Sequence, residues 1–326
     1  MTDYKTIFGR NIRLQTSDLT MSTATEGELF YSDTDSEFKV GVKVAAWAAG
    51  EAMSTAREGT MGFGIQTAAA AAGGENAVGT VLDATEEYDG TDWTAGEGIG
   101  TATRLGGAAG TLTAGLIFGG HATVDRTEEY DGTNWTAGNT INTGRHGMAG
   151  TGIQTDALAA GGSPTPANTN VESYNGSSWT AETAMSTSRL YSAGAGATAD
   201  ASLITGGIAS TPPTVSTANA ESWNGSSWTE VANLNSARYA LAGDGTQTAA
   251  IIFGGSITPG AGRTVNTEIW DGSSWTEVNN MATARMALGA GGTTAAAVGF
   301  SGTTPPVSAL TEEFSETVTL KTVTDS

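Results

Sequence analysis

Short apolar runs alternate with polar turns along most of the chain, and one arrangement of them recurs. The clearest copy reads YALAGDGT, AAIIFGG, TEIWDG and SSWTEV, within residues 239–278. These runs have the length of strands, and Asp-Gly or Asn-Gly between aromatic runs is a hairpin signal. Glycine costs a helix about 1 kcal/mol per position relative to alanine, so the glycine-rich runs disfavour helices. Each copy is therefore predicted to form four short antiparallel strands, which we call a to d.

Three marks repeat in register with these runs: an arginine before strand a, a glycine pair that closes strand b, and a glutamate that opens strand c. The six arginines and the six glutamates are Arg57, Arg104, Arg145, Arg189, Arg238, Arg285, Glu86, Glu128, Glu172, Glu221, Glu268 and Glu312. The arginines recur about every 46 residues, a period typical of propeller blades or helical arrays. Because helices are disfavoured, the sequence predicts six copies of one propeller blade.

One tryptophan per copy belongs to strand d, and one of them is displaced along the chain. The six are Trp47, Trp93, Trp135, Trp179, Trp228 and Trp275. Trp47 has no glutamate seven residues before it, and Glu312 has no tryptophan seven residues after it. Both are explained if residues 38–47 supply strand d of the last blade and residues 310–316 supply its strand c, which removes the free sheet edge. The predicted fold class is all-β, a six-bladed β-propeller of four-stranded antiparallel blades closed by the N-terminal strand.

The two chain ends lie outside this pattern. Residues 1–40 are predicted to form an N-terminal attachment arm with a β-hairpin, in which residues 28–31 and 37–42 flank a polar turn. Residues 41–316 form the propeller, and residues 317–326 form a C-terminal strand and tail whose side chains alternate between polar and apolar. An isolated hairpin is marginal in water. We therefore expect the two end segments to pair with each other, with another copy or with a partner protein.

Composition and charge exclude several classes of protein. The net charge is −20 with only 14 Lys and Arg in 326 residues, so no basic face for nucleic acid is expected. The chain has no cysteine, which excludes disulfides, thiolate metal sites and cysteine nucleophiles. The N-terminus lacks the apolar core of a secretion signal, and no apolar run is long enough to insert into a membrane. The two histidines and the absence of a P-loop lysine predict no metal and no cofactor.

Two resemblances add a family to this pattern. The glycine pair, the strand c aromatic, the tryptophan and the Met-Xaa-Xaa-Xaa-Arg segment resemble the kelch repeat over residues 41–316. The segment TEGELFYSDTDSEFKV resembles segments near the start of bacteriophage virion and tail-fibre proteins, and GDGTQTAAIIFGG with NGSSWTE is similar to kelch-like structural proteins of marine phages. The likeness implies a noncatalytic virion protein, used as a tail fibre, appendage or decoration module. It also implies homo-oligomers in the phage particle, an arm that binds other virion proteins, and a face that binds a host-surface glycan or protein.

Two other classes of function remain open at this point. One is a glycan-active enzyme, similar to a sialidase or depolymerase propeller. DGTDW superficially resembles an aspartate box, but that motif needs Asp-Xaa-Gly, and no arginine triad or nucleophile can be placed. The copper site of a kelch-type oxidase cannot be built without cysteine. The other class is a cellular kelch-type interaction module. We expect the protein not to be an enzyme.

The candidate ligand face is the set of loops that join strands b and c. The length between the glycine pair and the strand c glutamate varies most from copy to copy, and loops on a rigid scaffold carry recognition. The variation is also compatible with neutral drift. The candidate residues are Asn76, His121, Asp125, Arg126, Asn168, Asn170, Pro212, Pro213, Pro259, Arg263, Pro305 and Pro306.

The repeated side chains are predicted to be structural. The six tryptophans and the strand c aromatics could form a sugar-stacking platform, but a constant position in every copy favours packing between blades. The arginines and glutamates could form a ring of ions at the channel mouth that grips an anion. Buried Arg–Glu pairs are the favoured interpretation, because arginine suits bidentate contacts. The strand c aromatics are Tyr88, Tyr130, Tyr174, Trp223, Trp270 and Phe314.

Overall fold

The computed structural model describes residues 3–7, 10–15, 27–32, 35–164, 167–210, 215–258 and 262–323, with Pro212, Pro213 and Pro259 of the candidate face outside these ranges. The chain divides into two compact units. The larger unit is Trp47–Phe314, and the smaller one combines Met1–Ala46 with Ser315–Ser326. Within the described residues, no helix has the length and apolar character needed to cross a membrane.

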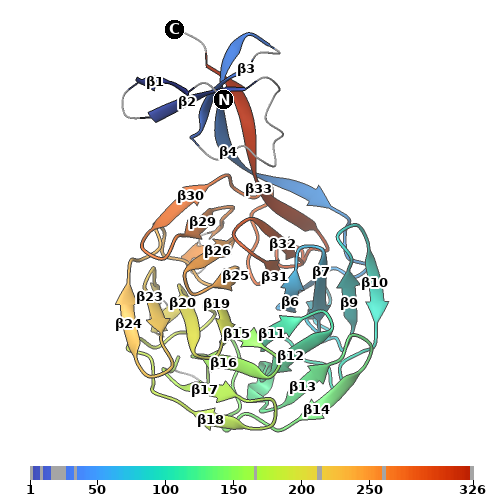
Figure 1. The fold of residues 1–326 in the computed structure, drawn as a ribbon. Helices are drawn as coiled ribbons and strands as arrows, with labels where there is room; N and C mark the ends of the chain where they lie inside the picture. The colour runs from blue at the N-terminus through green and yellow to red at the C-terminus, as the bar shows by residue number, and fades with distance from the viewer. Residues whose placement is uncertain are drawn as a thin grey trace. The chain divides into compact units, whose positions relative to one another are not determined.

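The larger unit is a six-bladed propeller, and the predicted fold class is confirmed (Figure 1). In each blade four antiparallel strands run from the axis outward in the order a, b, c, d. Blade 1 consists of β6 (Met61–Ile65), β7 (Ala68–Ala72), β9 (Thr85–Tyr88) and β10 (Trp93–Gly96). Blade 2 consists of β11 (Gly107–Thr111), β12 (Ala114–Phe118), β13 (Thr127–Tyr130) and β14 (Trp135–Gly138). Blade 3 consists of β15 (Ala149–Ile153), β16 (Asp156–Ala160), β17 (Val171–Tyr174) and β18 (Trp179–Ala181). Blade 4 consists of β19 (Ala193–Thr198), β20 (Ala201–Thr205), β23 (Ala220–Trp223) and β24 (Trp228–Val231). Blade 5 consists of β25 (Ala242–Thr246), β26 (Ala249–Phe253), β29 (Thr267–Trp270) and β30 (Trp275–Val278).

Blade 6 is built from both ends of the chain, as predicted, although its strand d begins at Trp47 and not at residue 38, because Met1–Ala46 belong to the smaller unit. Its strands a and b are β31 (Gly289–Gly292) and β32 (Ala296–Phe300), and β33 (Thr311–Thr322) and β4 (Glu37–Gly50) follow them in the sheet. The Trp47 ring centroid lies 5.4 Å from that of Phe314, although the two residues are far apart in sequence. The ring of blades is therefore closed by the N-terminal strand.

Short pairings join the connections between strands. They are formed by β5 (Arg57–Glu58) with β8 (Glu75–Asn76), β21 (Ile208–Ser210) with β22 (Val215–Ser216), and β27 (Ser256–Thr258) with β28 (Gly262–Arg263). The pairing of β5 with β8 joins a d–a connection to a b–c loop. Single bridges from His146 to Ser163 and from Tyr239 to Ser256 do the same in other blades. These two kinds of connection therefore emerge on one face of the propeller.

Strand a is rich in glycine and alanine because the blades converge at the axis. A Cβ atom on Gly62 of β6 would lie 2.7 Å from the backbone nitrogen of Ala290 in the neighbouring blade 6. Strand b is the most buried part of each blade, as in β26, where the last four side chains are fully covered. The core is thus a series of layers between neighbouring blades.

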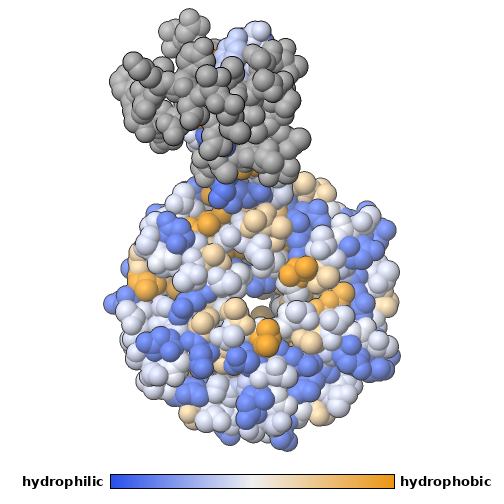
Figure 2. All heavy atoms as spheres, in the orientation of Figure 1, coloured by the Kyte–Doolittle hydropathy of each residue, from blue (hydrophilic) through white to orange (hydrophobic). Residues whose placement is uncertain are grey.

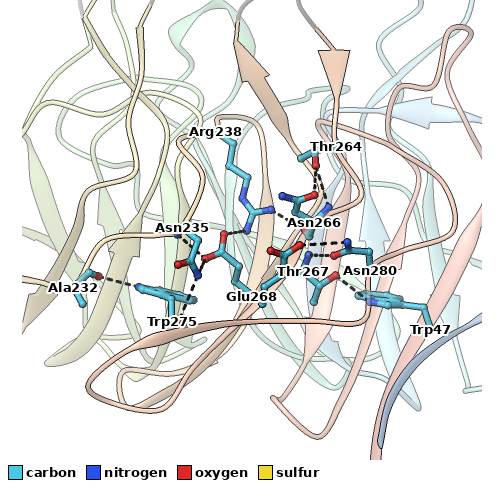
Figure 3. A network of polar contacts seen from close by, with 11 residues as sticks. Trp47, Ala232, Asn235, Arg238, Thr264, Asn266, Thr267, Glu268, Trp275 and Asn280 are labelled. Atoms are coloured by element: carbon cyan, nitrogen blue, oxygen red, sulfur yellow. Dashed lines mark hydrogen bonds and ion pairs between the residues drawn. The ribbon is translucent and has the colours of Figure 1, made fainter.

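The strand d tryptophans join each blade to the one before it. Four of them donate an Nε1 hydrogen bond to the threonine that opens strand c of the preceding blade, at 2.9 to 3.0 Å, as Trp47 does to Thr267 (Figure 3). Blades 3 and 4 open strand c with Val171 and Ala220, which have no hydroxyl. The tryptophans that follow them, Trp228 and Trp275, donate to main-chain carbonyls instead. The repeated tryptophan therefore packs between blades in every copy.

The aromatic residue of strand c also contacts the preceding blade, and its type depends on the residue that it meets there. Tyr88 donates its hydroxyl to Glu313 at 2.7 Å, and Tyr174 donates to Glu129 at 2.5 Å, each across a blade boundary. Tyr130 of blade 2 donates its hydroxyl to Glu87 of blade 1 in the same way. Where the preceding blade has serine or isoleucine at the glutamate position, the aromatic has no hydroxyl: Trp223, Trp270 and Phe314. Each blade is thus complementary to one particular neighbour.

The smaller unit is a sheet formed by both chain ends. It contains β1 (Asp3–Ile7), β2 (Arg10–Gln15), β3 (Leu29–Ser32), and the parts of β4 and β33 outside the propeller. β3 pairs antiparallel with β4 and aligns Tyr31 with Phe38. The C-terminal segment continues β33, and the Val323 nitrogen donates to the Phe38 carbonyl at 2.8 Å. The two chain ends therefore pair with each other.

Candidate functional site

Five of the repeated arginines form a buried unit that we call the Arg–Glu clamp. The pairs are Arg57–Glu86, Arg145–Glu172, Arg189–Glu221, Arg238–Glu268 and Arg285–Glu312, with N···O distances of 2.7 to 3.1 Å. All five arginine side chains are 0% exposed. Buried in this way, they do not present a ring of cations to solvent.

The clamp of blade 5 shows which hydrogen bonds the buried arginine and glutamate make (Figure 3). Arg238 donates to Glu268 at 2.9 Å and to the Asn266 carbonyl at 2.8 Å. The second oxygen of Glu268 accepts the backbone N–H of Asn235 at 2.7 Å. The pair therefore holds the d–a connection against the start of strand c, and it acts on the backbone of its own blade.

Blade 2 departs from this pattern, and the prediction that Arg104 belongs to the structural set is wrong. In blade 3 the carbonyl of the clamp residue, Arg145, accepts the Gly120 N–H at 2.9 Å. In blade 2 the equivalent carbonyl, which accepts the Gly74 N–H, belongs to Thr103. Arg104 therefore lies one position beyond the clamp. Its Nε is 2.8 Å from Glu75.

Glu128 of blade 2 pairs with a different arginine as a result. Arg126, two residues earlier on the same segment, makes its ion pair. Arg126 was predicted to face ligand, and it replaces the missing clamp instead. A signal for this change is present in the sequence, because Trp93 and Arg104 are eleven residues apart, whereas the other tryptophan–arginine pairs are ten apart.

A closed ring of main-chain hydrogen bonds surrounds the axis just after the clamps. Each blade contributes one residue, whose N–H donates to the carbonyl of its counterpart in the preceding blade at 2.7 or 2.8 Å. All six residues have φ between +51° and +64°. Residues other than glycine rarely adopt this left-handed backbone conformation. The members of this axial ring are Gly59, Leu105, Gly147, Tyr191, Ala240 and Ala287.

The residues immediately before the axial ring differ in all six blades. In order of blade they are Glu58, Arg104, His146, Leu190, Tyr239 and Met286. All except Leu190 line a cavity of about 320 Å³, together with His121 and Tyr191. We call this the mouth cavity. Figure 2 shows that the propeller has an opening at its centre on the face that is in view.

The cavity was not predicted from the sequence, because the predicted ligand face rested on variation in loop length. A usable signal is the position eleven residues after the strand d tryptophan, which differs in every copy. Of the predicted ligand-face residues, His121 alone lines the mouth cavity among the described residues. Its ring centroid lies 6.1 Å from that of His146, and His146 lies 6.1 Å from Tyr191.

The mouth cavity holds charged groups of both signs in a partly desolvated setting. Burial raises the pKa of Glu58, while Arg104 acts to lower it and Glu75 to raise it. Burial lowers the pKa of His146, and the nearby His121 and Arg104 lower it further. The neutral form of His146 is therefore favoured. Its buried Nδ1 has no hydrogen-bond partner among the described residues.

The other predicted ligand-face residues have local roles or lie away from the cavity. Asn76 accepts backbone N–H groups from Val78 and Thr80 and so shapes its own loop. Asn168 accepts the N–H of Asn170 in the same manner. The remaining described members lie in loops or short strands: Asp125, Arg263, Pro305 and Pro306. Of these, Arg263 is near enough to Glu58 to act on the pKa of its carboxyl.

Below the axial ring the channel is lined by strand a residues and has a volume of about 250 Å³. Asp244 is the one charged side chain among the described residues that line it. Its carboxylate accepts the Gly245 N–H at 2.6 Å and the Gly292 N–H at 2.8 Å. Burial outweighs these bonds and raises the pKa of Asp244 to about 7.

We expect Asp244 to make stability depend on pH near neutrality. Its folded pKa of about 7 is above the ordinary value of 3.8, so the protonated form is favoured by folding. Relative to Asp244→Asn, the wild type should be most stable at acid pH and should lose stability as pH rises from 3.8 through 7. Urea unfolding of both proteins at several pH values measures this difference. Parallel stability profiles would show that the carboxyl titrates normally.

In the part of the chain that the structure describes, no three His, Cys, Asp or Glu side chains gather as a metal site requires. A scan of the sequence against protein-family models finds no match, and a search of curated proteins finds no relative. The propeller fold itself is consistent with a binding or interaction module, and its chemistry must be argued from the mouth cavity.

Proposed function

We propose that the protein is a noncatalytic structural component of a bacteriophage virion, which binds a ligand on the face that carries the mouth cavity. The observation that carries the binding role is the contrast between two neighbouring positions of the repeat. The clamp arginine is retained in five blades, whereas the next residue differs in all six. Identical positions maintain the frame, and the differing ones provide a site with its own chemistry.

Support for the virion comes from the sequence resemblance and from the chain ends. The segment that resembles phage virion proteins forms the β3–β4 hairpin, and the C-terminal strand pairs with it. An exposed sheet edge is a surface for strand addition. We place the attachment to other virion proteins, or to further copies of this chain, on this sheet. The tail-fibre, appendage and decoration roles all use such a division between anchor and binding face.

The glycan-active enzyme is the weaker alternative. Glycoside hydrolases use two carboxyl groups with separate roles. At the mouth cavity Glu58 is one candidate, but the neighbouring Glu75 is in an ion pair with Arg104. That ion pair holds the Glu75 side chain against Arg104, which suits binding better than a catalytic role.

Purified virions provide the test. Antibodies against the propeller should label intact particles in negative-stain electron microscopy, and mass spectrometry should find the chain among the particle proteins. In limited proteolysis, residues 1–46 should be cut in the isolated protein and protected in the particle. Absence of the chain from purified particles would overturn the virion role. Equal protection in both states would overturn the anchoring role of the arm.

A further inference from the structure

The mouth cavity presents hydrogen-bonding groups of opposite character side by side. Blade 1 contributes the acceptor Glu58, blade 2 the donor Arg104, and blade 3 the imidazole of His146. Arg104 uses its Nε toward Glu75, and no described residue bonds its two terminal nitrogens. His146 Nδ1 is buried without a partner. A buried polar atom without a partner is costly, so His146 Nδ1 favours a ligand that bonds to it, and the terminal nitrogens of Arg104 are available to the same ligand.

The balance of charge selects the kind of ligand. Among the residues that line the cavity, Glu58 and Arg104 carry opposite charges, and burial favours the neutral form of His146. An anion would meet the Glu58 carboxylate, and a cation would meet the Arg104 guanidinium group. A hydroxyl group both donates and accepts, so a neutral ligand with several adjacent hydroxyls can bond Glu58, Arg104 and His146 together.

The opposite side of the cavity supplies aromatic surface. Tyr191 and Tyr239 come from blades 4 and 5, and both line the cavity. Tyrosine offers an apolar ring and a hydroxyl at its edge, which suits a ligand with both C–H faces and polar substituents. A sugar ring has this combination.

The floor and the size of the cavity favour a small ligand over a peptide. The N–H and carbonyl groups of the axial ring are all used in bonds between blades. An extended peptide that binds by strand addition therefore finds no open backbone groups there. The volume of about 320 Å³ lies near the small end of the range of about 300 to 1,000 Å³ for ligand pockets.

From these contacts we infer that the mouth cavity binds a neutral sugar residue at the end of a glycan chain. The inference rests on the proposed binding role of this face, and it specifies the ligand. Glu58 and Arg104 bond vicinal hydroxyls, His146 bonds a third, and Tyr239 and Tyr191 contact the ring. The sugar is bound without a chemical step, and the rest of the glycan extends into solvent.

Saturation-transfer NMR on the full-length protein tests this. The probes are the methyl glycosides of glucose, galactose and mannose, with N-acetylneuraminic acid as the anionic comparison. We expect saturation transfer to at least one neutral glycoside, and at least tenfold weaker binding for Arg104→Gln and for Tyr239→Ala. Both variants leave the five buried clamps intact, and circular dichroism checks that they are folded. Val78→Ser is the matched control, because Val78 is 85% exposed on a b–c loop and does not line the cavity.

Each other outcome contradicts the inference. Binding of N-acetylneuraminic acid alone would make the cavity an anion site. Binding that survives in both mouth variants, or that is lost in Val78→Ser, would move the site to the loops. No binding of any probe by folded protein would exclude a terminal neutral sugar. The virion role is tested separately by the particle experiments, so either conclusion can fail alone.

Discussion

Replacing Arg145 with alanine is expected to lower the free energy of unfolding by about 3–5 kcal/mol, the usual cost of breaking a buried ion pair. The change leaves Glu172 buried without its cation and removes the donor to the Asn170 carbonyl. Burial lowers the pKa of Arg145 while Glu172 acts to raise it, so the carboxylate favours the charged guanidinium that burial disfavours. Urea unfolding followed by tryptophan fluorescence measures the loss.

Arg104→Gln is the matched control for that experiment. Arg104 occurs in the same repeated segment, but it lies outside the clamp and its side chain is 21% exposed. Ion pairs that solvent reaches contribute about 0–1 kcal/mol, so this variant should unfold close to the wild type. Equal losses in the two variants would mean that the clamp is not what stabilises the blades.

Deleting residues 1–50 is expected to cost at least about 5 kcal/mol, because it removes the strand that closes the ring. Blade 6 would lose Trp47, which packs on Phe253 and Phe314 and donates to Thr267. It would also expose the edge of β33 to pairing with other chains. Thermal unfolding and size-exclusion chromatography would reveal lower stability and self-association.

Two controls separate closure from a general effect of truncation. Deletion of residues 1–26 keeps β3 and β4, and we expect it to unfold like the full chain. A synthetic peptide of residues 37–50, added to the longer deletion, should restore stability as its concentration rises, because it binds the folded state. A stable, monomeric propeller without residues 1–50 would show that strand closure is dispensable.

The fold was accessible from the sequence because each blade repeats the same packing problem. The tryptophan, the glycine pair and the strand c glutamate recur since every blade meets an equivalent neighbour. The displaced Trp47 and Glu312 then identified the closing blade. Pairing across blades was less visible, because Tyr88 and Glu313 belong to different copies and are far apart in sequence.

The mouth cavity was not accessible in the same way, for two physical reasons. The axial ring is made by main-chain atoms, and its positive φ angles fall on leucine, tyrosine and alanine as well as glycine, so composition does not mark it. The shift at Arg104 also hid the pattern, because the repeated arginine was assumed to be equivalent in all blades. One extra residue of spacing was enough to move the arginine from the buried clamp to a position that lines the mouth cavity.

The axial ring has a consequence for how this module can change over generations. Each of its members lies twelve positions after the tryptophan of the preceding strand d, in blade 2 as in the others. Since the bonds join only peptide groups, exchanging the adjacent side chain leaves them in place. The five of these positions that line the mouth cavity can therefore mutate independently, with little penalty in folding. A lineage that must follow a changing target could acquire new specificity by point substitution alone, without insertions and without rebuilding a loop.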